Sequence, residues 1–157
     1  MVADIYVAGS LRHAPREWWQ IYEKIGAVAE KLGYTVHIPH VHTVGEVNNS
    51  ASDLHNPNLD MGIRAKAYQK NYDVIKDARI IIAEVTRPST GTGVEIGFGI
   101  MQNKQIICLA HKDVDISSMV LGPAHLGLLK MIRYEQECDA LKQLEDVLTS
   151  IKTEMPA

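Results

Sequence analysis

The sequence predicts an α/β protein with a doubly wound, mainly parallel five-stranded sheet and helices on both faces. Two observations support this fold. Short apolar runs alternate along the chain with longer segments whose apolar residues recur at helical spacing, and the run at residues 79–85 is apolar almost throughout. Strands that alternate with helices form parallel sheets, because each connection crosses back over a face of the sheet. A strand without polar alternation is typical of a sheet that is covered on both faces.

The predicted elements follow one another in regular order. Strands are expected at 4–9, 35–39, 79–85, 105–109 and 129–134, and helices at 15–32, 59–75, 94–102 and 138–152, with a helical turn at 117–121. The polar stretch at 41–58 is expected to be a long loop, which is either a functional lid or a tolerated insertion. At 157 residues and 46% hydrophobic composition, the chain has the size of one domain, so we expect a single domain over residues 1–157.

Composition argues against several classes of function. The 16 Lys and Arg residues are outnumbered by 19 Asp and Glu, and no basic cluster is present, so a polynucleotide partner is not expected. Apolar stretches are too short to span a bilayer and no signal sequence is evident, which predicts a cytoplasmic protein without a membrane partner. Cys108 and Cys138 lack metal-ligand spacing, so no metal and no cofactor are expected.

The loop after the first strand is one candidate for ligand binding, because ligands of doubly wound sheets bind where strands end and helices begin. Gly9 would let the backbone approach a ligand, while Ser10 and Arg12 could hold an anion at the next helix terminus. The alternative is an ordinary Gly-Ser turn, since neither GxGxxG nor GxxxxGK[ST] is present.

The loop after the third strand is richer in polar groups. Residues 88–93 combine a proline, three hydroxyl side chains and two glycines directly before Glu95. We expect Glu95 in the first helical turn, where free amide groups and the helix dipole would stabilise its carboxylate. The alternative is a first-turn glutamate that serves only helix stability.

Two further side chains stand at strand ends. Glu84 ends an apolar strand, where it is either a functional acid with a raised pKa or a structural partner of Arg87. His40 follows the second strand and is a candidate hydrogen-bonding group rather than a metal ligand, because no other His or Cys has ligand spacing to it.

Three segments together resemble the nucleoside 2-deoxyribosyltransferase family. They read YVAGSLR at 6–12, IAEVTRPSTGTGVEIG at 82–97 and ISSM at 116–119, and the resemblance extends from residue 4 to about residue 122. It implies a flavodoxin-like fold, an oligomer built on homodimers, and a glutamate that attacks the anomeric carbon. Glu95 is the matching position. The resemblance also places Tyr6 beside this nucleophile and His40 near a phosphate.

Within the family, the chain is more similar to the 2'-deoxynucleoside 5'-monophosphate N-glycosidase branch than to the base-exchanging branch. The resemblance implies that serines at Ser10, Ser89 and Ser117 hold the 5'-phosphate, with Ser117 donated across the dimer interface. Hydroxyl donors suit a dianionic phosphate, whereas an aspartate would repel it. The predicted substrate-binding residues are Gly9, Ser10, Leu11, Arg12, His40, Ser89, Gly91, Gly93, Ser117 and Met119.

Asn71 is a departure from the family pattern, which usually has an aspartate in the helix before the third strand. An amide can hold the sugar or the base by hydrogen bonds, but it cannot transfer a proton. Asp73 is the nearest carboxylate, and it would replace Asn71 only if the helix were shifted locally. We therefore expect Glu95, Tyr6 and Asn71 to form the catalytic set.

The sequence thus predicts cleavage of the N-glycosidic bond of 2'-deoxynucleoside 5'-monophosphates through a deoxyribosyl-Glu95 intermediate. Three alternatives remain open at this point: base exchange between free deoxynucleosides, a non-catalytic nucleotide-binding module, and a ribonucleotide N-glycosidase of the related cytidylate-hydrolysing type.

Overall fold

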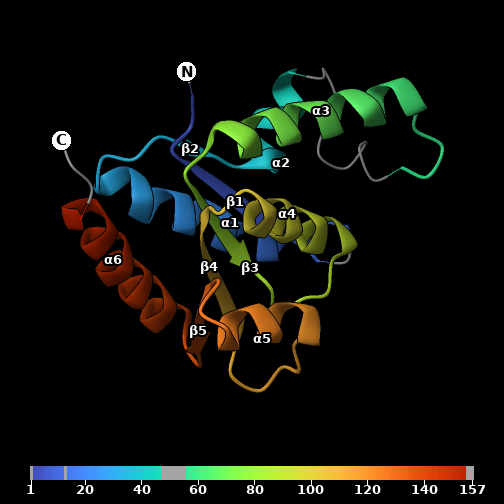
Figure 1. The fold of residues 1–157 in the computed structure, drawn as a ribbon. Helices are drawn as coiled ribbons and strands as arrows, with labels where there is room; N and C mark the ends of the chain where they lie inside the picture. The colour runs from blue at the N-terminus through green and yellow to red at the C-terminus, as the bar shows by residue number, and fades with distance from the viewer. Residues whose placement is uncertain (1, 13, 47–55, 155–157) are drawn as a thin grey trace.

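The computed structural model describes residues 2–12, 14–46 and 56–154 and has the predicted alternation of strands and helices (Figure 1). The strands are β1 (Ile5–Gly9), β2 (Val36–His37), β3 (Ile80–Glu84), β4 (Gln105–His111) and β5 (Lys130–Tyr134). The helices are α1 (Arg16–Lys31), α2 (Pro39–Glu46), α3 (Met61–Asp77), α4 (Thr90–Met101), α5 (Ser118–His125) and α6 (Glu137–Glu154).

All five strands form one parallel sheet in the order β2-β1-β3-β4-β5. This is the flavodoxin-like strand order, so the predicted fold is confirmed. In this order the chain moves outward from β1 in both directions. The connections after β1 and β3 consequently leave on opposite faces of the sheet.

Two apolar cores fill the space on the two faces of the sheet. One core lies under α1 and α6 and includes Tyr22, Ile25 and Leu144. The other lies under α3, α4 and α5 and includes Tyr6, Ile96 and the alternate side chains of β3. Both faces of β3 are therefore covered, which explains why its sequence is apolar up to Glu84. No helix among the described residues is long and apolar enough to cross a membrane.

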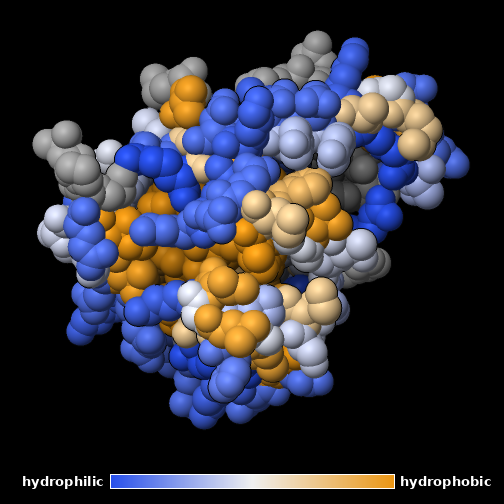
Figure 2. All heavy atoms as spheres, viewed as in Figure 1, coloured by the Kyte–Doolittle hydropathy of each residue, from blue (hydrophilic) through white to orange (hydrophobic). Residues whose placement is uncertain are grey.

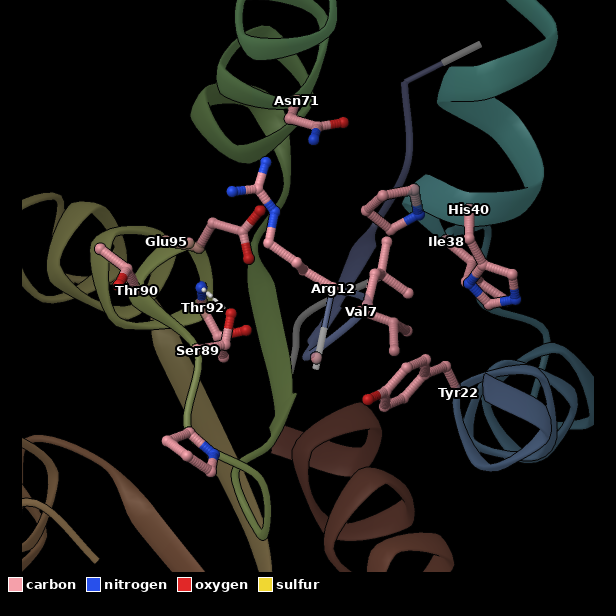
Figure 3. A pocket seen from close by; sticks show the side chains of 15 residues that line it. Val7, Arg12, Tyr22, Ile38, His40, Asn71, Ser89, Thr90, Thr92 and Glu95 are labelled. Atoms are coloured by element: carbon pink, nitrogen blue, oxygen red, sulfur yellow. Dashed lines mark hydrogen bonds between the residues drawn. The ribbon is translucent and has the colours of Figure 1, made fainter. Parts of the chain in front are cut away.

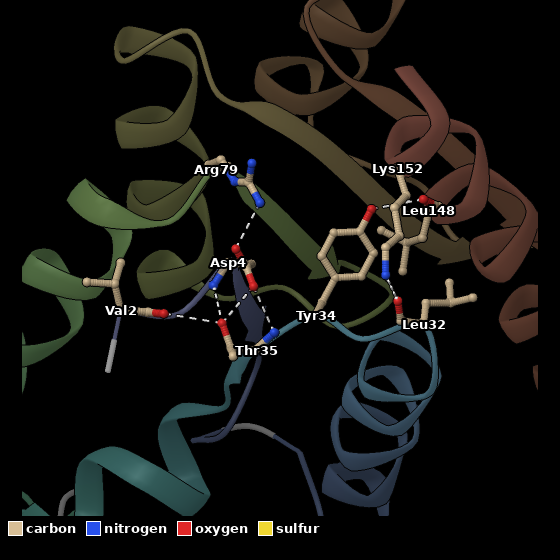
Figure 4. Close-up of polar contacts among 8 residues, drawn as sticks. All are labelled: Val2, Asp4, Leu32, Tyr34, Thr35, Arg79, Leu148 and Lys152. Carbon is tan, nitrogen blue, oxygen red and sulfur yellow. Dashed lines mark hydrogen bonds and ion pairs between the residues drawn. The ribbon is translucent and has the colours of Figure 1, made fainter. Parts of the chain in front are cut away.

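A polar cluster at the amino ends of the strands fixes the register of the central strands (Figure 4). The Asp4 carboxylate accepts hydrogen bonds from the backbone N–H and hydroxyl of Thr35, at 2.9 and 2.7 Å, and from the Arg79 guanidinium, at 2.9 Å. Asp4, Thr35 and Arg79 directly precede β1, β2 and β3, respectively. The three strands therefore start at a common level.

Two predicted boundaries in the first half of the chain are wrong. Residues 41–46 belong to α2 rather than to a loop, and residues 47–55 of the predicted loop lie outside the described residues. The second strand pairs over two residues only, because Pro39 has no N–H to donate and begins α2. Thr43 and Val44 are buried against α3, so packing stabilises a helix that its sequence alone does not indicate.

The predicted start of the fourth helix is also wrong. Helix α4 begins at Thr90, four residues before the predicted start, and Ser89 is its N-cap. The Ser89 hydroxyl accepts a hydrogen bond from the backbone N–H of Thr92 at 3.2 Å. Gly91 and Gly93 suggested a loop, yet a serine cap and the apolar face of the following residues are sufficient to start the helix there.

Close packing of α4 on the sheet predicts a cost for any side chain at Gly99. A Cβ atom there would lie 2.6 Å from Cδ1 of Ile81 and 3.0 Å from Cδ1 of Ile106, which are both buried. We expect Gly99→Ala to lower the free energy of unfolding by about 1–3 kcal/mol in urea denaturation. Gly97→Ala on the same helix is the matched control, because its Cβ would meet nothing within 4 Å. Equal effects of both variants would contradict this packing argument.

Candidate active site

A cavity of about 520 Å³ lies at the carboxyl ends of β1 and β3 (Figure 3). Its walls come from the segments after β1 and β3, from the start of α2, and from α1 and α3. The lining residues are Val7, Gly9, Leu11, Arg12, Tyr22, Ile38, Pro39, His40, Asn71, Pro88, Ser89, Thr90, Gly91, Thr92 and Glu95. Doubly wound sheets bind ligands at this point, where the strand order reverses, and the volume suits a small molecule.

Glu95 and Tyr6 form the central contact of the cavity. The Tyr6 hydroxyl donates a hydrogen bond to Oε1 of Glu95 at 2.5 Å. Tyr6 is fully buried within β1, and Glu95 stands in the second turn of α4. The predicted position of Glu95 in the first helical turn is therefore wrong, since the helix starts earlier. Among the described residues that line the cavity, Glu95 is the only carboxylic acid.

The surroundings of Glu95 favour its neutral form. Burial raises the pKa of Glu95 to about 7, and the hydrogen bond from Tyr6 lowers it by less. Burial and the neighbouring Glu95 also raise the pKa of Tyr6 well above its usual value, so Tyr6 remains a donor at neutral pH. The expected stabilisation of the Glu95 anion by the helix terminus is thus outweighed, because the carboxyl lies more than one turn from the terminal amides.

The N-terminus of α4 lines the cavity on the same side as Glu95 and presents hydroxyl and amide groups. Ser89, Thr90, Gly91 and Thr92 all line the cavity there. The Thr92 hydroxyl is buried and has no hydrogen-bond partner among the described residues. Because the first amides of a helix lack internal partners and carry the positive end of the dipole, this wall can hold an anion.

The end of β1 contributes Gly9 to the cavity, and the segment after it contributes Leu11 and Arg12 but not Ser10. Ser10 is buried, and its hydroxyl lies 3.5 Å from the carbonyl oxygen of Pro88, to which it donates. Gly9 has a packing role: a Cβ atom would lie 2.2 Å from the ring of Tyr22, whose hydroxyl donates to the Ser10 carbonyl at 2.7 Å. The Arg12 side chain is exposed and extends towards Glu95 and Asn71 (Figure 3).

Asn71 and His40 also line the cavity. The Asn71 carbonyl oxygen accepts a hydrogen bond from the buried Thr43 hydroxyl at 2.6 Å. The His40 Nε2 lies 3.0 Å from Oε1 of Glu23 on α1. Sequence reasoning missed Thr43, because it lies in the segment that was expected to be a loop.

Ser117, Met119 and Gly93 lie away from this cavity and line a second cavity of about 640 Å³ between α4 and α5. The two cavities share the wall formed by Pro88, Ser89, Thr90 and Thr92. Ser117 is the N-cap of α5 and accepts a hydrogen bond from the N–H of Met119 at 3.2 Å. Hydrophobic residues gather over α4 and α5 on this face (Figure 2). Exposed members are Val94, Met101, Met119 and Leu121.

Glu84 is held by hydrogen bonds within the protein and does not line the cavity, although its partner is not Arg87. It is fully buried, and its carboxyl accepts hydrogen bonds from the hydroxyls of Thr86 and Tyr134, the latter at 2.9 Å. Burial raises the pKa of Glu84. The Arg87 guanidinium instead lies over the ring of Trp18, at 4.9 Å from its centroid. Across the part of the chain that the structure describes, no group of three or more His, Cys, Asp or Glu residues is arranged to hold a metal.

The fold and the site together define a flavodoxin-like α/β protein with a tyrosine-held carboxyl group in a small-molecule cavity. Residues 5–140 match the family model described as nucleoside 2-deoxyribosyltransferase. The chain therefore belongs to the nucleoside 2-deoxyribosyltransferase family. This confirms the predicted family and the prediction of an enzyme that acts on deoxynucleosides or deoxynucleotides.

Individual relatives agree with this assignment. A Methanosarcina mazei protein with the provisional name 2'-deoxynucleoside 5'-phosphate N-hydrolase 1 is 30% identical over 141 residues, which cover 90% of this chain and 80% of the relative. The human 5-hydroxymethyl-dUMP N-hydrolase is 29% identical over 140 residues, which cover 87% of this chain and 75% of the relative.

Two solved structures share the fold. The CMP N-glycosidase BcmB of Clostridium botulinum has a TM-score of 0.60 and 20% identity, covering 90% of this chain and 97% of the other. The 2-deoxyribosyltransferase of Bacillus psychrosaccharolyticus has a TM-score of 0.61 and 20% identity, covering 87% of this chain and 89% of the other.

The raised pKa of Glu95 predicts a pH-dependent stability. Between about pH 4.5, where the unfolded chain releases this proton, and about pH 7, the folded protein retains it. The free energy of unfolding therefore falls as the pH rises through this window. The full shift in the pKa of Glu95 corresponds to about 3 kcal/mol of stability. Solvent in the cavity reduces this value, because it partly hydrates the carboxylate. We expect Glu95→Gln to be more stable than wild type by about 1–3 kcal/mol at pH 8, and by less at pH 5.

Urea denaturation at both pH values measures this difference. Glu30→Gln, at an exposed position on α1, is the control and should match wild type at each pH. An equal effect of Glu95→Gln at pH 5 and pH 8 would show that the Glu95 carboxyl is not desolvated in the folded protein.

Proposed function

We propose that this protein hydrolyses the N-glycosidic bond of 2'-deoxynucleoside 5'-monophosphates, with Glu95 as the nucleophile. The observation that carries the proposal is the Glu95 carboxyl itself. It is held by the Tyr6 hydroxyl at 2.5 Å and lines a cavity that the N-terminus of its own helix also lines. The names of the Methanosarcina and human relatives describe N-hydrolysis of deoxynucleoside 5'-phosphates, which supports the same substrate class here.

Glu95 suits a nucleophilic role because no second carboxylic acid lines the described part of the cavity. Glycosidic cleavage passes through an oxocarbenium-like state, which a carboxylate on the face opposite the base stabilises and can trap. In the first step an oxygen of Glu95 bonds to C1', and the C1'–N bond breaks with its electron pair leaving on the base. Water then attacks C1', which releases deoxyribose 5-phosphate and restores the Glu95 carboxyl.

The N-terminus of α4 is the proposed phosphate site. Ser89 and Gly91 lie at this terminus together with the Thr90 hydroxyl. Arg12 lines the same cavity, and its exposed side chain can turn towards this terminus to add a charged donor. A dianionic phosphate gains both from the terminal amides and from the guanidinium. Ser10 would support the phosphate site indirectly, since it is buried and donates to the carbonyl of Pro88, next to the N-cap Ser89.

A homodimer would complete the phosphate site. Ser117 does not reach the cavity of its own chain, but it lines the adjoining cavity between α4 and α5. The exposed Met101 and Met119 on the same face give this surface the apolar character of an interface. We therefore propose that a second copy covers this face and contributes its Ser117 to the phosphate.

The experiment that tests the activity measures base release from the four dNMPs and the matching free deoxynucleosides, with and without adenine as acceptor. We expect hydrolysis of the monophosphates alone, and a loss on the order of 10³-fold or more in Glu95→Ala. Glu135→Ala, at an exposed position beyond β5, is the control. Release from free nucleosides only when adenine is present would instead identify a base-exchanging transferase. Faster cleavage of CMP than of dCMP would identify a ribonucleotide N-glycosidase.

The dimer is tested by mixing two impaired variants, Glu95→Gln and Ser117→Ala. If Ser117 acts across the interface, each mixed dimer regains one site with both residues intact, so mixing restores activity. Ser117→Ala alone should raise KM about tenfold, because a hydrogen bond to a charged phosphate is lost. Ser118→Ala is the control and should leave KM unchanged. If mixing restores nothing although mixed dimers form, Ser117 does not act across an interface.

A further inference from the structure

A buried polar relay stands behind Asn71. Asn71 belongs to α3, Thr43 to α2 and His37 to β2. The Thr43 hydroxyl donates to Oδ1 of Asn71 at 2.6 Å, and Nε2 of His37 lies 2.8 Å from the same hydroxyl oxygen. Thr43 is 1% exposed and His37 is 6% exposed. The relay therefore connects the cavity wall to the edge strand through groups that solvent does not reach.

The directions of these hydrogen bonds follow from the number of hydrogens available. A threonine hydroxyl has one hydrogen, and here it is donated to the Asn71 carbonyl oxygen, which can only accept. Nε2 of His37 must then carry a hydrogen and donate it to Thr43. With its oxygen held by Thr43, Asn71 turns its amide nitrogen towards Arg12 and Glu95 (Figure 3).

The same histidine also supports the nucleophile side of the site. The ring of His37 stacks on the ring of Tyr6, with centroids 5.7 Å apart and an interplanar angle of 12°. The Tyr6 hydroxyl holds Glu95 at 2.5 Å. Asn71 and Glu95, which reach the cavity from different helices, are thus both positioned through contacts with His37.

We propose that Thr43 and His37 are positioning residues that fix Asn71 as a hydrogen-bond donor to the leaving base, so that the base departs as a hydrogen-bonded anion without a general acid at this position. The inference rests on the proposed N-glycosidase function. To that function it adds the orientation of the Asn71 amide, the residues that fix this orientation, and the class of substrate that the site favours.

The chemistry of the bases fits a donor. In pyrimidines O2, and in purines N3, is an acceptor next to the glycosidic nitrogen. As the C1'–N bond breaks, its electron pair moves onto the base while an oxygen of Glu95 bonds to C1'. Part of the new negative charge resides on that acceptor, where an N–H of Asn71 stabilises it. The released base then takes its proton from water. Donors that meet developing charge in this way contribute about 10²–10³ to a rate.

Two other donors of the cavity, on Tyr22 and His40, are engaged with protein groups. The Tyr22 hydroxyl donates to the Ser10 carbonyl, and burial raises its pKa. Arg12 is assigned to the phosphate in the proposed site. His40 is bonded to Glu23 and lies across the cavity from Glu95 (Figure 3). Substrates are therefore selected by the stability of the departing anion, which favours deoxynucleotides with electron-poor bases.

The orientation of Asn71 is tested without turnover by ¹⁵N NMR of the histidine side chains in the wild-type protein. The His37 signals are assigned by their loss in His37→Gln. We expect Nε2 of His37 to carry the hydrogen. A hydrogen on Nδ1 alone would overturn the proposal, because Thr43 would then donate to His37 and Asn71 would present its oxygen to the cavity.

Catalysis is tested with Thr43→Val, which removes the hydroxyl at nearly constant shape. We expect kcat to fall about tenfold with KM within about twofold, because the donor is misaligned but not lost. Thr43→Ser should restore kcat. Thr149→Val, at an exposed hydroxyl on α6, is the control. Unchanged kcat in a folded Thr43→Val would overturn the positioning role.

Substrate selection is tested with 5-fluoro-dUMP, dUMP and dTMP, whose leaving bases differ in acidity. Wild type should cleave 5-fluoro-dUMP fastest, and Asn71→Asp, which supplies an acid, should reduce the difference among the three. If the rates of wild type and Asn71→Asp depended equally on the acidity of the leaving base, the departure of the base as an anion would be overturned. If wild type cleaves no monophosphate, the proposed function fails together with the departure of the base as an anion, whereas the NMR result still decides the orientation of Asn71.

Discussion

The site depends on the adjacency of β1 and β3 at the centre of the sheet. Because the chain leaves these two strands towards opposite faces, their carboxyl ends border an open crevice rather than a helix. Tyr6 within β1 can then reach Glu95 on the helix that follows β3, across 89 residues of sequence. If another strand lay between β1 and β3, the Tyr6 hydroxyl and the Glu95 carboxyl would lie at least one strand spacing further apart.

The Tyr6–Glu95 pair carries a cost in stability. Burial raises the pKa of Glu95 to about 7, so the folded protein must desolvate a charge whenever Glu95 is ionised. Tyr6 reduces this cost with one short hydrogen bond while it remains neutral. The rigid, fully covered strand that holds Tyr6 keeps that bond in place, and the stacked His37 extends the same support to the wall that carries Asn71.

Residues close in sequence were the easiest to predict. The motif at 82–97 and the apolar strands located Glu95, Ser89 and the β1 segment, and the structure brings them to one cavity. Errors occurred where local composition misled. Glycines at 91 and 93 hid the first turn of α4, and polar residues at 41–46 hid α2, since packing against α3 stabilises that helix. Thr43 consequently had no place in a site predicted from sequence.

The sequence by itself determined the five strands, the mainly parallel character of the sheet and Glu95 as a candidate nucleophile, because apolar periodicity and a contiguous motif are local properties of the chain. Tertiary structure alone decided the raised pKa of Glu95, the partners of Glu84, the exclusion of Ser10 from the cavity and the hydrogen bond between Thr43 and Asn71. Each of these features depends on burial or on a hydrogen bond between distant segments. The local sequence around a residue specifies neither how deeply that residue is buried nor which distant residue contacts it.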